Sequence, residues 1–482
     1  MSVRKKIVSL MKNKSRFLLA FLAVAIVPFF SGCGSQDEGY LVNLQIWGVF
    51  DDSTVFNEII SQYKTLNPYI GEIKYRKFSQ DTYSQELLDA LASGQGPDIF
   101  LINNSWLPAY VNKLEPAPAP LIGEQDVKNN FPDTVLNDFV DSGKVYAVPL
   151  SVDSMVLYYN KDMLNAAGIT SAPKNWQEFN EAIRKLTIID SFGNIQQSGA
   201  AIGTARNINR SSDLLSLLMF QSGVAMPMKK GDLAKFDEAV VSNGETVQAG
   251  EMALGYYTQF AKLSTTGNIQ NPLYTWNTMQ HNSVDAFAEG TAAMMFNYSW
   301  QNTSIKSKNP KLNYGITMVP QMNQNKPASV SNYWGFGVSK NKINTVSAAG
   351  SQVAASVPNE VRTHEAWQFL RFLTLKNTGS VTLYNARTKK SKEFPVNFDP
   401  AFSYLKKTQQ PAARRDLIEA QKTDAVLGPF AQSNLIAKHW YQQDPYNVDI
   451  IFGDIIEAVV RGDVSLHDGL VVAKNKVNYS SR

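Results

Sequence analysis

Two periods of hydrophobic and polar residues alternate along the first hundred positions after the N-terminal leader. In 41–47, Val42, Leu44 and Ile46 alternate with polar residues, the pattern of a half-buried strand. In 53–66 apolar residues recur at helical spacing, with Ser53 or Thr54 as the cap. The same criteria predict a strand at 73–75, a helix at 81–93 and a strand at 97–102. This strand–helix order is typical of a parallel sheet with right-handed crossovers, so we expect an α/β fold.

A second α/β stretch begins near residue 150. We expect a strand at 155–160, then a helix at 175–186 that Asn175 caps, with Glu178 three residues on. The pattern further predicts helices at about 211–222, 248–264, 282–289 and 364–375, and strands at 292–297, 314–319 and 334–339. The last 70 residues are expected to be mostly helical.

The N-terminus has the pattern of a secretory signal. Residues 1–32 carry six basic residues, no acidic residue and the apolar run 17–30, which is shorter than a membrane-spanning helix. Cys33, the chain's single cysteine, follows directly. The boundary resembles a bacterial lipobox, although Phe30 stands where Leu is favoured. We therefore expect 1–32 to be a signal peptide, Cys33 to be lipidated, and 33–39 to tether the protein to the outer face of the cell membrane; a plain signal peptide with an incidental cysteine is the alternative.

Charge and motifs exclude several classes of protein. Beyond the leader the chain has 40 basic and 42 acidic residues, so it lacks the excess of basic residues that nucleic-acid binding needs. One cysteine permits no intrachain disulfide, and the four histidines are far apart in the sequence. The motifs GxSxG, HExxH, the phosphate-binding loop and GxGxxG are absent. We expect no metal, no cofactor, no catalytic residues and a monomer.

Aromatic residues make up 11% of the chain and include eight tryptophans. Trp176 and Trp367 lie on predicted helix faces and are assigned to the core. The other six stand at strand ends, helix starts or loops: Trp47, Trp106, Trp276, Trp300, Trp334 and Trp440. The carboxyl ends of strands in an open α/β sheet face the ligand crevice, where aromatic rings can stack on the flat faces of sugars. Ordinary packing is the alternative for each of them.

Five stretches carry a family resemblance. They are GQGPDIFLINNSWLPAYVNKLEPA (94–117), GKVYAVPLSVDSMVLYYNKDMLNAAGI (143–169), FAEGTAAMMFNYSW (287–300), WGFGVSKN (334–341) and VVRGDVSLHDGLVVAKNKVN (459–478). In this order, over about 440 residues, the chain resembles the carbohydrate-type extracellular solute-binding proteins of bacterial ABC importers, the group that includes maltodextrin-binding proteins.

The resemblance implies a two-lobed periplasmic-binding-protein fold, with hinge crossovers and a ligand cleft between the lobes. Lobe one would comprise 40–149 with 327–377, and lobe two 150–326 with 378–482. The expected function is capture of a sugar or oligosaccharide and its delivery to the permease subunits of an importer. The alternatives are a non-sugar solute, such as a polyol phosphate or a peptide, and a surface carbohydrate hydrolase.

The predicted ligand-binding residues combine strand ends with positions that match family binding loops. Asp153 at the crossover and Trp300 after a buried strand would reach the ligand from lobe two, and Asn104 and Trp106 from lobe one. Asp51 and Asp52 are weaker candidates, with helix capping as their alternative role. The remaining candidates are Asn297, Asn332, Tyr333, Trp334 and Trp440.

Overall fold

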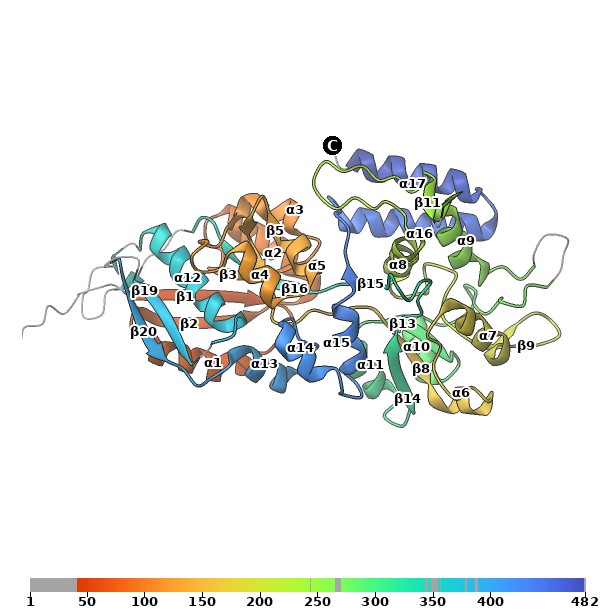
Figure 1. The fold of residues 1–482 in the computed structure, drawn as a ribbon, viewed down its shortest axis with the longest axis horizontal. Helices are drawn as coiled ribbons and strands as arrows, with labels where there is room; N and C mark the ends of the chain where they lie inside the picture. Colours follow the sequence, from red (N-terminus) through yellow and green to blue (C-terminus); the bar gives the residue numbers. More distant parts are fainter. Residues whose placement is uncertain are drawn as a thin grey trace, which may run out of the picture.

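The structure, a computed structural model, describes residues 41–242, 244–264, 270–342, 346–347, 354–355, 357–377, 379–385 and 389–480. The expected signal peptide, Cys33 and the tether lie outside this part of the chain. The described residues form an elongated molecule of two lobes that meet at a narrow waist (Figure 1). No helix among them combines the length and the apolar character needed to cross a membrane.

Lobe one is built on a mixed sheet with the strand order β2-β1-β3-β16-β4, and β7 also pairs with β16. Strands β1, β2 and β3 are parallel, while β16 runs antiparallel to β3 and places Trp334 opposite Asn103. The strands of this sheet are β1 (Val42–Gly48), β2 (Ile70–Lys77), β3 (Ile99–Asn103), β4 (Leu114–Glu115), β7 (Ala147–Val148) and β16 (Trp334–Ser339). The antiparallel return of β16 joins a distant segment to the N-terminal unit.

Helices cover this sheet. Those of the N-terminal segment are α1 (Ser53–Leu66), α2 (Gln80–Ala92), α3 (Leu107–Tyr110), α4 (Glu124–Asn130) and α5 (Asp133–Phe139). Later segments add α12 (Asn359–Thr374), the hairpin β19 (Ser380–Asn385) and β20 (Lys390–Pro395), α13 (Pro400–Thr408) and α14 (Arg415–Gln421). Helices α1, α12 and α13 pack against one another, and the two later helices thereby belong to lobe one.

The predicted division into lobes differs from the structure in one segment. Residues 378–482 were expected in lobe two, but apolar side chains from Val381 to Ala431 pack in the same core as β1 and α1. Lys407 and Ser403 of α13 also bind Glu58 of α1. Residues 381–431 therefore complete lobe one, because their apolar side chains cover α1 and α12, whereas the chain from Trp440 onward packs in the core of lobe two, as expected.

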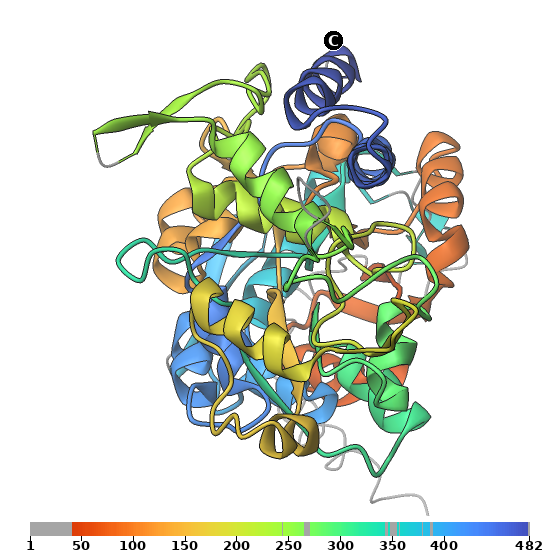
Figure 2. The same cartoon turned by 90° about the vertical axis from the view of Figure 1, so that its right-hand side faces the viewer.

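Lobe two contains a small antiparallel sheet in the order β13-β8-β14. The strands are β8 (Val156–Asn160), β13 (Met294–Asn297) and β14 (Tyr314–Met318). The main helices are α6 (Lys161–Ala166), α7 (Trp176–Leu186), α8 (Ser211–Ser222), α9 (Ala249–Gln259), α10 (Ser283–Glu289), α11 (Gln301–Lys308), α16 (Pro445–Arg461) and α17 (Leu466–Ser480). Seen from the free end of this lobe, the blue helices α16 and α17 lie at its top (Figure 2).

The lobes are joined where the chain crosses between the two cores. The crossings lie near residues 152–155, 330–333 and 431–440. At the last two, β15 (Ser329–Val330) pairs in parallel with β21 (Ala437–Lys438), and the third crossing begins within α15 (Gly428–Asn434). Asn332 N donates to Asp153 O at 3.0 Å, and Ser331 N donates to Lys438 O at 3.1 Å. The crossings are therefore hydrogen-bonded to one another and form a single hinge band.

Candidate functional site

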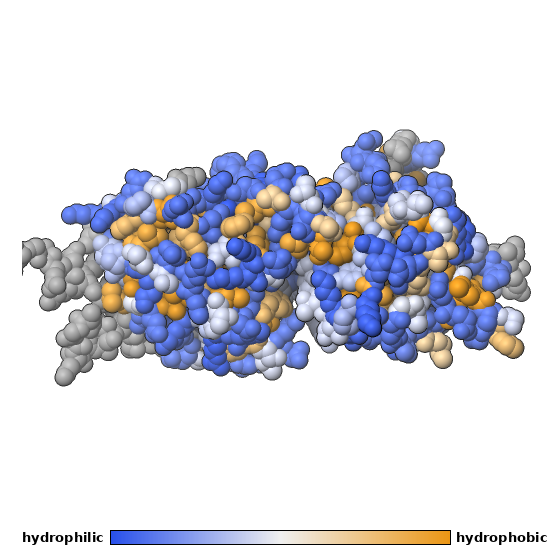
Figure 3. Space-filling model, turned by 90° about the horizontal axis from the view of Figure 1, so that it is seen from below, coloured by the Kyte–Doolittle hydropathy of each residue, from blue (hydrophilic) through white to orange (hydrophobic). Residues whose placement is uncertain are grey.

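A large cavity lies between the lobes at the hinge band. Its volume is about 1610 Å³, and both lobes and the crossings contribute side chains to it. The space-filling view shows the waist at which the two lobes meet (Figure 3). Small-molecule sites typically enclose about 300–1,000 Å³. The cavity therefore has room for a ligand larger than an ordinary small molecule.

Aromatic rings form the lobe-one wall of the cavity. Trp106 stacks on Tyr110 with centroids 5.4 Å apart, and its edge meets Trp334 at 4.9 Å. Phe50 continues the row beyond Trp334 at 5.3 Å. These residues follow β1, follow β3 or begin β16, so the sheet edge brings them together. Both tryptophans are half-buried, because their outer faces remain open to the cavity.

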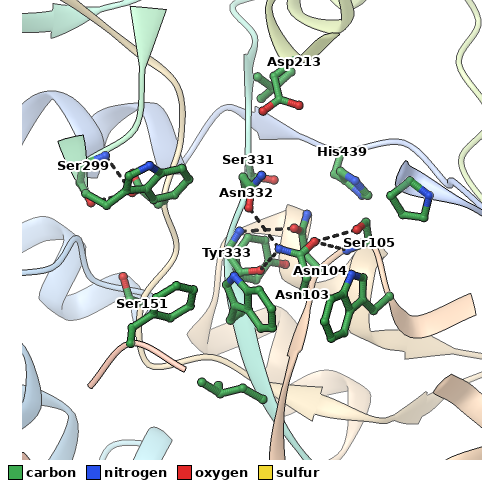
Figure 4. A pocket seen from close by; sticks show the side chains of 18 of the residues that line it. Asn103, Asn104, Ser105, Ser151, Asp213, Ser299, Ser331, Asn332, Tyr333 and His439 are labelled. Carbon is green, nitrogen blue, oxygen red and sulfur yellow. Dashed lines mark hydrogen bonds between the residues drawn. The ribbon is translucent and has the colours of Figure 1, made fainter. Parts of the chain in front are cut away.

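Behind these rings lies a hydrogen-bonded network around Asp138 of α5. One of its carboxylate oxygens, Oδ2, accepts bonds from Asn104 Nδ2 at 3.2 Å, Tyr333 Oη at 2.8 Å and Thr134 Oγ1 at 3.1 Å. Asn104 Oδ1 accepts in turn from Tyr333 N at 3.3 Å. Figure 4 shows Asn103, Asn104, Tyr333 and Asn332 gathered at this wall. The side-chain polar groups of this network are thus bonded to protein partners, and this part of the wall is held in place without a ligand.

The same network reaches the hinge band. Asp138 Oδ1 lies 3.1 Å from Nδ1 of His439, which belongs to the third crossing and lines the cavity. Asn332, on the second crossing, accepts from Asn103 Nδ2 at 3.1 Å. Both contacts connect lobe one with chain segments that lead into lobe two.

Asp153 occupies the base of the lobe-two wall. It is only 5% exposed, and its Oδ2 accepts from Ser299 N at 2.9 Å and Ser299 Oγ at 2.6 Å. Its second oxygen, Oδ1, is buried and has no hydrogen-bond partner among the described residues. Burial raises the pKa of this carboxyl to about 7, while the bonds from Ser299 and the nearby backbone N–H of Ser154 oppose the rise. An unpaired acceptor is costly to bury, so a donor supplied by a ligand would stabilise it.

Trp300 and Arg210 line the cavity on the same wall as Asp153. Trp300 is 39% exposed and stacks on Tyr298 with centroids 4.6 Å apart. The Arg210 guanidinium lies 5.4 Å from the Trp300 ring centroid. Arg210 precedes α8 in the left-handed conformation, at φ 69°, and its buried Nε lacks a partner within the described part of the chain.

Three further carboxylates, Asp213, Asp444 and Asp449, line the cavity from lobe two. Asp213 accepts from Tyr298 Oη at 2.9 Å. Asp449 of α16 has its pKa raised to about 6 by desolvation and by the charge of Asp213. Lobe two and the third crossing thus present four carboxylates to the cavity, those of Asp153, Asp213, Asp444 and Asp449, together with the cationic side chains of Arg210, Lys306 and Lys438. This set can both accept hydrogen bonds from hydroxyl groups and donate to them.

Most residues predicted for the site line the cavity. These are Asp51, Asn104, Trp106, Asp153, Trp300, Asn332, Tyr333, Trp334 and Trp440. Trp440 is 2% exposed, packs between Phe236 and Phe452, and donates to Ser216 Oγ at 3.2 Å. Its ring is therefore mainly part of the lobe-two core.

Two predicted residues do not line the cavity. Asp52 is exposed and pairs with Lys77 at 3.1 Å, and it precedes α1 without a capping bond from its side chain. Asn297 is fully buried beneath the wall and donates from Nδ2 to Asn209 Oδ1 at 3.0 Å. Of the other tryptophans at strand ends and loops, Trp47 and Trp276 are core residues.

Sequence reasoning missed several lining residues. Arg210 and Asp213 belong to a helix start that gave only a secondary-structure signal, and His439 and Asp449 come from the C-terminal segment. Phe50 directly follows the first strand, so its strand-end position was an available signal. No group of three or more His, Cys, Asp or Glu side chains in the described ranges is arranged to hold a metal ion.

Solved structures with the same fold include several sugar-binding proteins. The cyclic α-maltosyl-1,6-maltose binding protein of Arthrobacter globiformis gives a TM-score of 0.67 at 17% identity, covering 92% of this chain and 99% of that one. The sugar-binding protein MalE of Xanthomonas citri gives 0.65 at 18% identity, covering 91% and 97%. UgpB of Mycobacterium tuberculosis, solved with glycerophosphocholine, gives 0.62 at 17% identity, covering 91% and 98%. These similarities confirm the two-lobed fold.

Curated relatives match a smaller part of the chain. A binding protein of Brucella abortus is 23% identical over 277 residues, 55% of this chain and 59% of that protein. The maltodextrin-binding protein MdxE of Bacillus subtilis is 23% identical over 283 residues, 55% of this chain and 58% of that protein. The matches therefore span less than two thirds of these relatives. The sequence profile of the bacterial extracellular solute-binding proteins, in contrast, matches residues 51–377. The chain therefore belongs to the bacterial extracellular solute-binding protein family, which consists of binding proteins and not enzymes, as the sequence predicted.

Proposed function

We propose that this protein is a receptor that captures a sugar or oligosaccharide between its lobes and delivers it to an ABC importer. The observation that carries the proposal is the pairing of two unlike walls across one cavity. Lobe one offers the rings of Trp106 and Trp334, and lobe two offers Trp300 with Asp153 and Asp213. Rings can stack on the apolar faces of a sugar while carboxylates accept hydrogen bonds from its hydroxyl groups.

Closure of the lobes would complete the site. The hinge band is short and hydrogen-bonded, so the lobes can rotate about it as two bodies. A ligand that touches both walls stabilises the closed form, and that form would dock on the permease. Binding proteins of the same fold that hold maltotetraose and maltose support a saccharide ligand.

A phosphate-containing ligand is the second candidate. UgpB shows that the fold can hold glycerophosphocholine, and four cationic side chains line the cavity and could face an anion: Lys113, Arg210 with its unpaired Nε, Lys306 and Lys438. Six aspartates line the cavity against four lysine and arginine side chains, and this excess of carboxylates opposes an anion, because like charges repel at short range. The saccharide is therefore the better match.

A thermal-shift screen of the mature protein tests the proposal. The probes are mono-, di- and oligosaccharides of glucose, mannose and xylose, together with glycerophosphocholine and glycerol 3-phosphate. A ligand bound at 100 times its Kd stabilises the fold by about 2.7 kcal/mol, which raises Tm. A shift with a saccharide supports the proposal, and a shift with the phosphates alone replaces it with the second candidate.

We also propose that Cys33 anchors the protein to the membrane by lipidation. The support is the basic and apolar leader followed by the single cysteine of the chain. Cys33→Ser should move the folded protein from the membrane fraction to the soluble fraction, with unchanged Tm. Retention of this variant in the membrane would exclude lipidation as the anchor.

A further inference from the structure

A second cavity adjoins the lobe-two wall of the large cavity. It measures about 410 Å³, within the usual range for small-molecule sites, and lies between the loop 205–210, the start of α8 and one face of α16. We call it the side cavity. Arg210, Asp213 and Asp449 line both this cavity and the large one. The two spaces therefore meet along a shared edge.

The α16 face that lines the two cavities carries an apolar strip. Tyr446 lines the large cavity and Ile450 lines the side cavity, four residues further on. This spacing places them on one face of the helix, together with Asp449 and Gly453. Tyr446 is 78% exposed and Ile450 is 45% exposed. An exposed ring followed by an exposed aliphatic side chain thus leads from one cavity into the other.

The opposite side of the side cavity is held rigidly. Glu457 accepts from the backbone nitrogens of Ala205 at 2.8 Å and Arg206 at 3.1 Å. The buried Asn297 donates to Asn209, whose backbone nitrogen donates to Ser283 Oγ at 2.9 Å. Fixed loops lose little conformational entropy when they bind a ligand, so this wall is prepared for binding.

The charges of the side cavity favour hydroxyl groups over an ion. Asp213, Asp449 and Asp454 can accept hydrogen bonds, while Arg206 and Arg210 can donate them. This mixture carries a slight excess of negative charge, which disfavours phosphates and carboxylates. A neutral polyhydroxyl group satisfies both kinds of residue.

We propose that the side cavity is an outer saccharide subsite, which binds the units of an oligosaccharide that extend beyond the cleft. The inference rests on the proposed function and adds a ligand length to it. Tyr446 would stack on a sugar unit at the exit of the cleft. The preferred ligand is then an oligosaccharide longer than the large cavity alone accommodates.

Calorimetric titration with maltose, mannose and xylose series of two to seven units tests this subsite. In the series that binds, we expect the wild-type Kd to fall with chain length. Tyr446→Ala should weaken the longest member about three- to tenfold and leave the shortest within twofold. Tyr479→Ala is the matched control, because Tyr479 is equally exposed on α17 and lines neither cavity.

Gly453→Phe provides a second variant, because a Cβ at Gly453 meets only Ala205 at 3.8 Å and the ring would fill the side cavity. This variant should abolish the increase in affinity with chain length, while Tm and the Kd of the shortest saccharide stay unchanged. Equal losses for short and long saccharides, or no gain with length in the wild type, would overturn the subsite alone. If no saccharide binds, the proposed function fails and the subsite fails with it.

Discussion

The two walls of the cavity satisfy their polar groups in different ways. On lobe one, Asn104 and Tyr333 bond to each other and to Asp138, and the rings in front are packed edge to face. On lobe two, Asp153 Oδ1 and Arg210 Nε are buried and have no partner among the described residues. The polar side chains behind the lobe-one rings are therefore hydrogen-bonded within the protein, whereas lobe two keeps buried polar atoms to which a ligand can bond.

Because of this difference, we expect lobe one to determine mainly the position of the ligand and lobe two to determine mainly its affinity. A wall whose bonds are internal fixes where a ring stacks but gains few new hydrogen bonds on binding. A wall with unpaired buried groups recovers their desolvation cost when a ligand bonds to them. We therefore expect lobe-two substitutions to affect affinity and lobe-one substitutions to affect stability as well.

The largest effect is expected at Asp153. Asp153→Asn keeps the shape and removes the charge, and charged hydrogen bonds contribute roughly 1.5–3 kcal/mol, or about 10- to 150-fold in affinity. Calorimetric titration with the saccharide found in the screen measures the loss. Asp52→Asn is the control, because this carboxylate lies outside the cavity and should leave Kd unchanged. Wild-type affinity in the Asp153 variant would remove the residue from the site.

Affinity should also depend on pH through the same carboxyl. With a pKa of about 7 in the free protein, Asp153 is largely protonated at pH 5.5 and accepts hydrogen bonds from hydroxyl groups less well. We expect affinity to rise by about tenfold between pH 5.5 and pH 8. The dependence should shrink in Asp153→Asn, and an equally steep profile in that variant would assign it to another group.

Without ligand, the raised pKa of Asp153 makes stability fall as pH rises, whereas affinity is expected to rise. Between pH 4 and pH 7 the native carboxyl keeps a proton that the unfolded chain has lost, so its contribution to the free energy of unfolding falls as pH rises through this window. Urea unfolding of Asp153→Asn at pH 4.5 and 7.5 should show a smaller fall than the wild type.

The same substitution, tryptophan to alanine, can be made on both walls, at Trp300 on lobe two and at Trp106 on lobe one. Trp300→Ala should weaken saccharide binding about three- to tenfold with little change in Tm, because the ring rests mainly on Tyr298. Trp106→Ala should weaken binding similarly and also lower the free energy of unfolding by roughly 1–3 kcal/mol, since its ring packs against Tyr110, Trp334 and Tyr83. Equal stability losses in the two variants would contradict the comparison.

The smallest effect on affinity is expected at Asn104. Asn104→Ala leaves Tyr333 N without its side-chain acceptor and Asp138 with one donor fewer, so it should destabilise the fold by roughly 1–3 kcal/mol. Affinity should change by less than threefold. Urea unfolding and titration of the same preparation separate the two quantities, and a tenfold loss of affinity at unchanged stability would make Asn104 a direct ligand contact.

Local patterns predicted much of the fold. Helix α1 and strand β16 have the expected bounds, and Asn175 caps α7 with Glu178 as its partner. Helix α12 begins at Asn359, five residues before the prediction, because Pro358 and not the amphipathic run marks its start. The hairpin β19–β20 was missed, and so was its place in lobe one, since packing on a distant helix has no local signature.

Local patterns also predicted only part of the site. Strand ends identified Trp106, Trp334 and Trp300, because the sheet edge places them at the cavity whatever lies opposite. Asn297 was expected at the surface of the site but is buried one layer beneath it, since sequence gives a strand end without the side chain's depth. Arg210 required the left-handed turn before α8, which no residue pattern announces.

The return of the chain to lobe one also has a consequence for biosynthesis. The core of that lobe contains residues from Val42 to Ala431, and the other lobe is completed only by α16 and α17. Nearly the whole polypeptide must emerge before either core can close. A nascent chain would therefore expose strand β1 and its neighbours for most of its synthesis, which favours slow, non-local folding and gives chaperones and export machinery a long period to engage it.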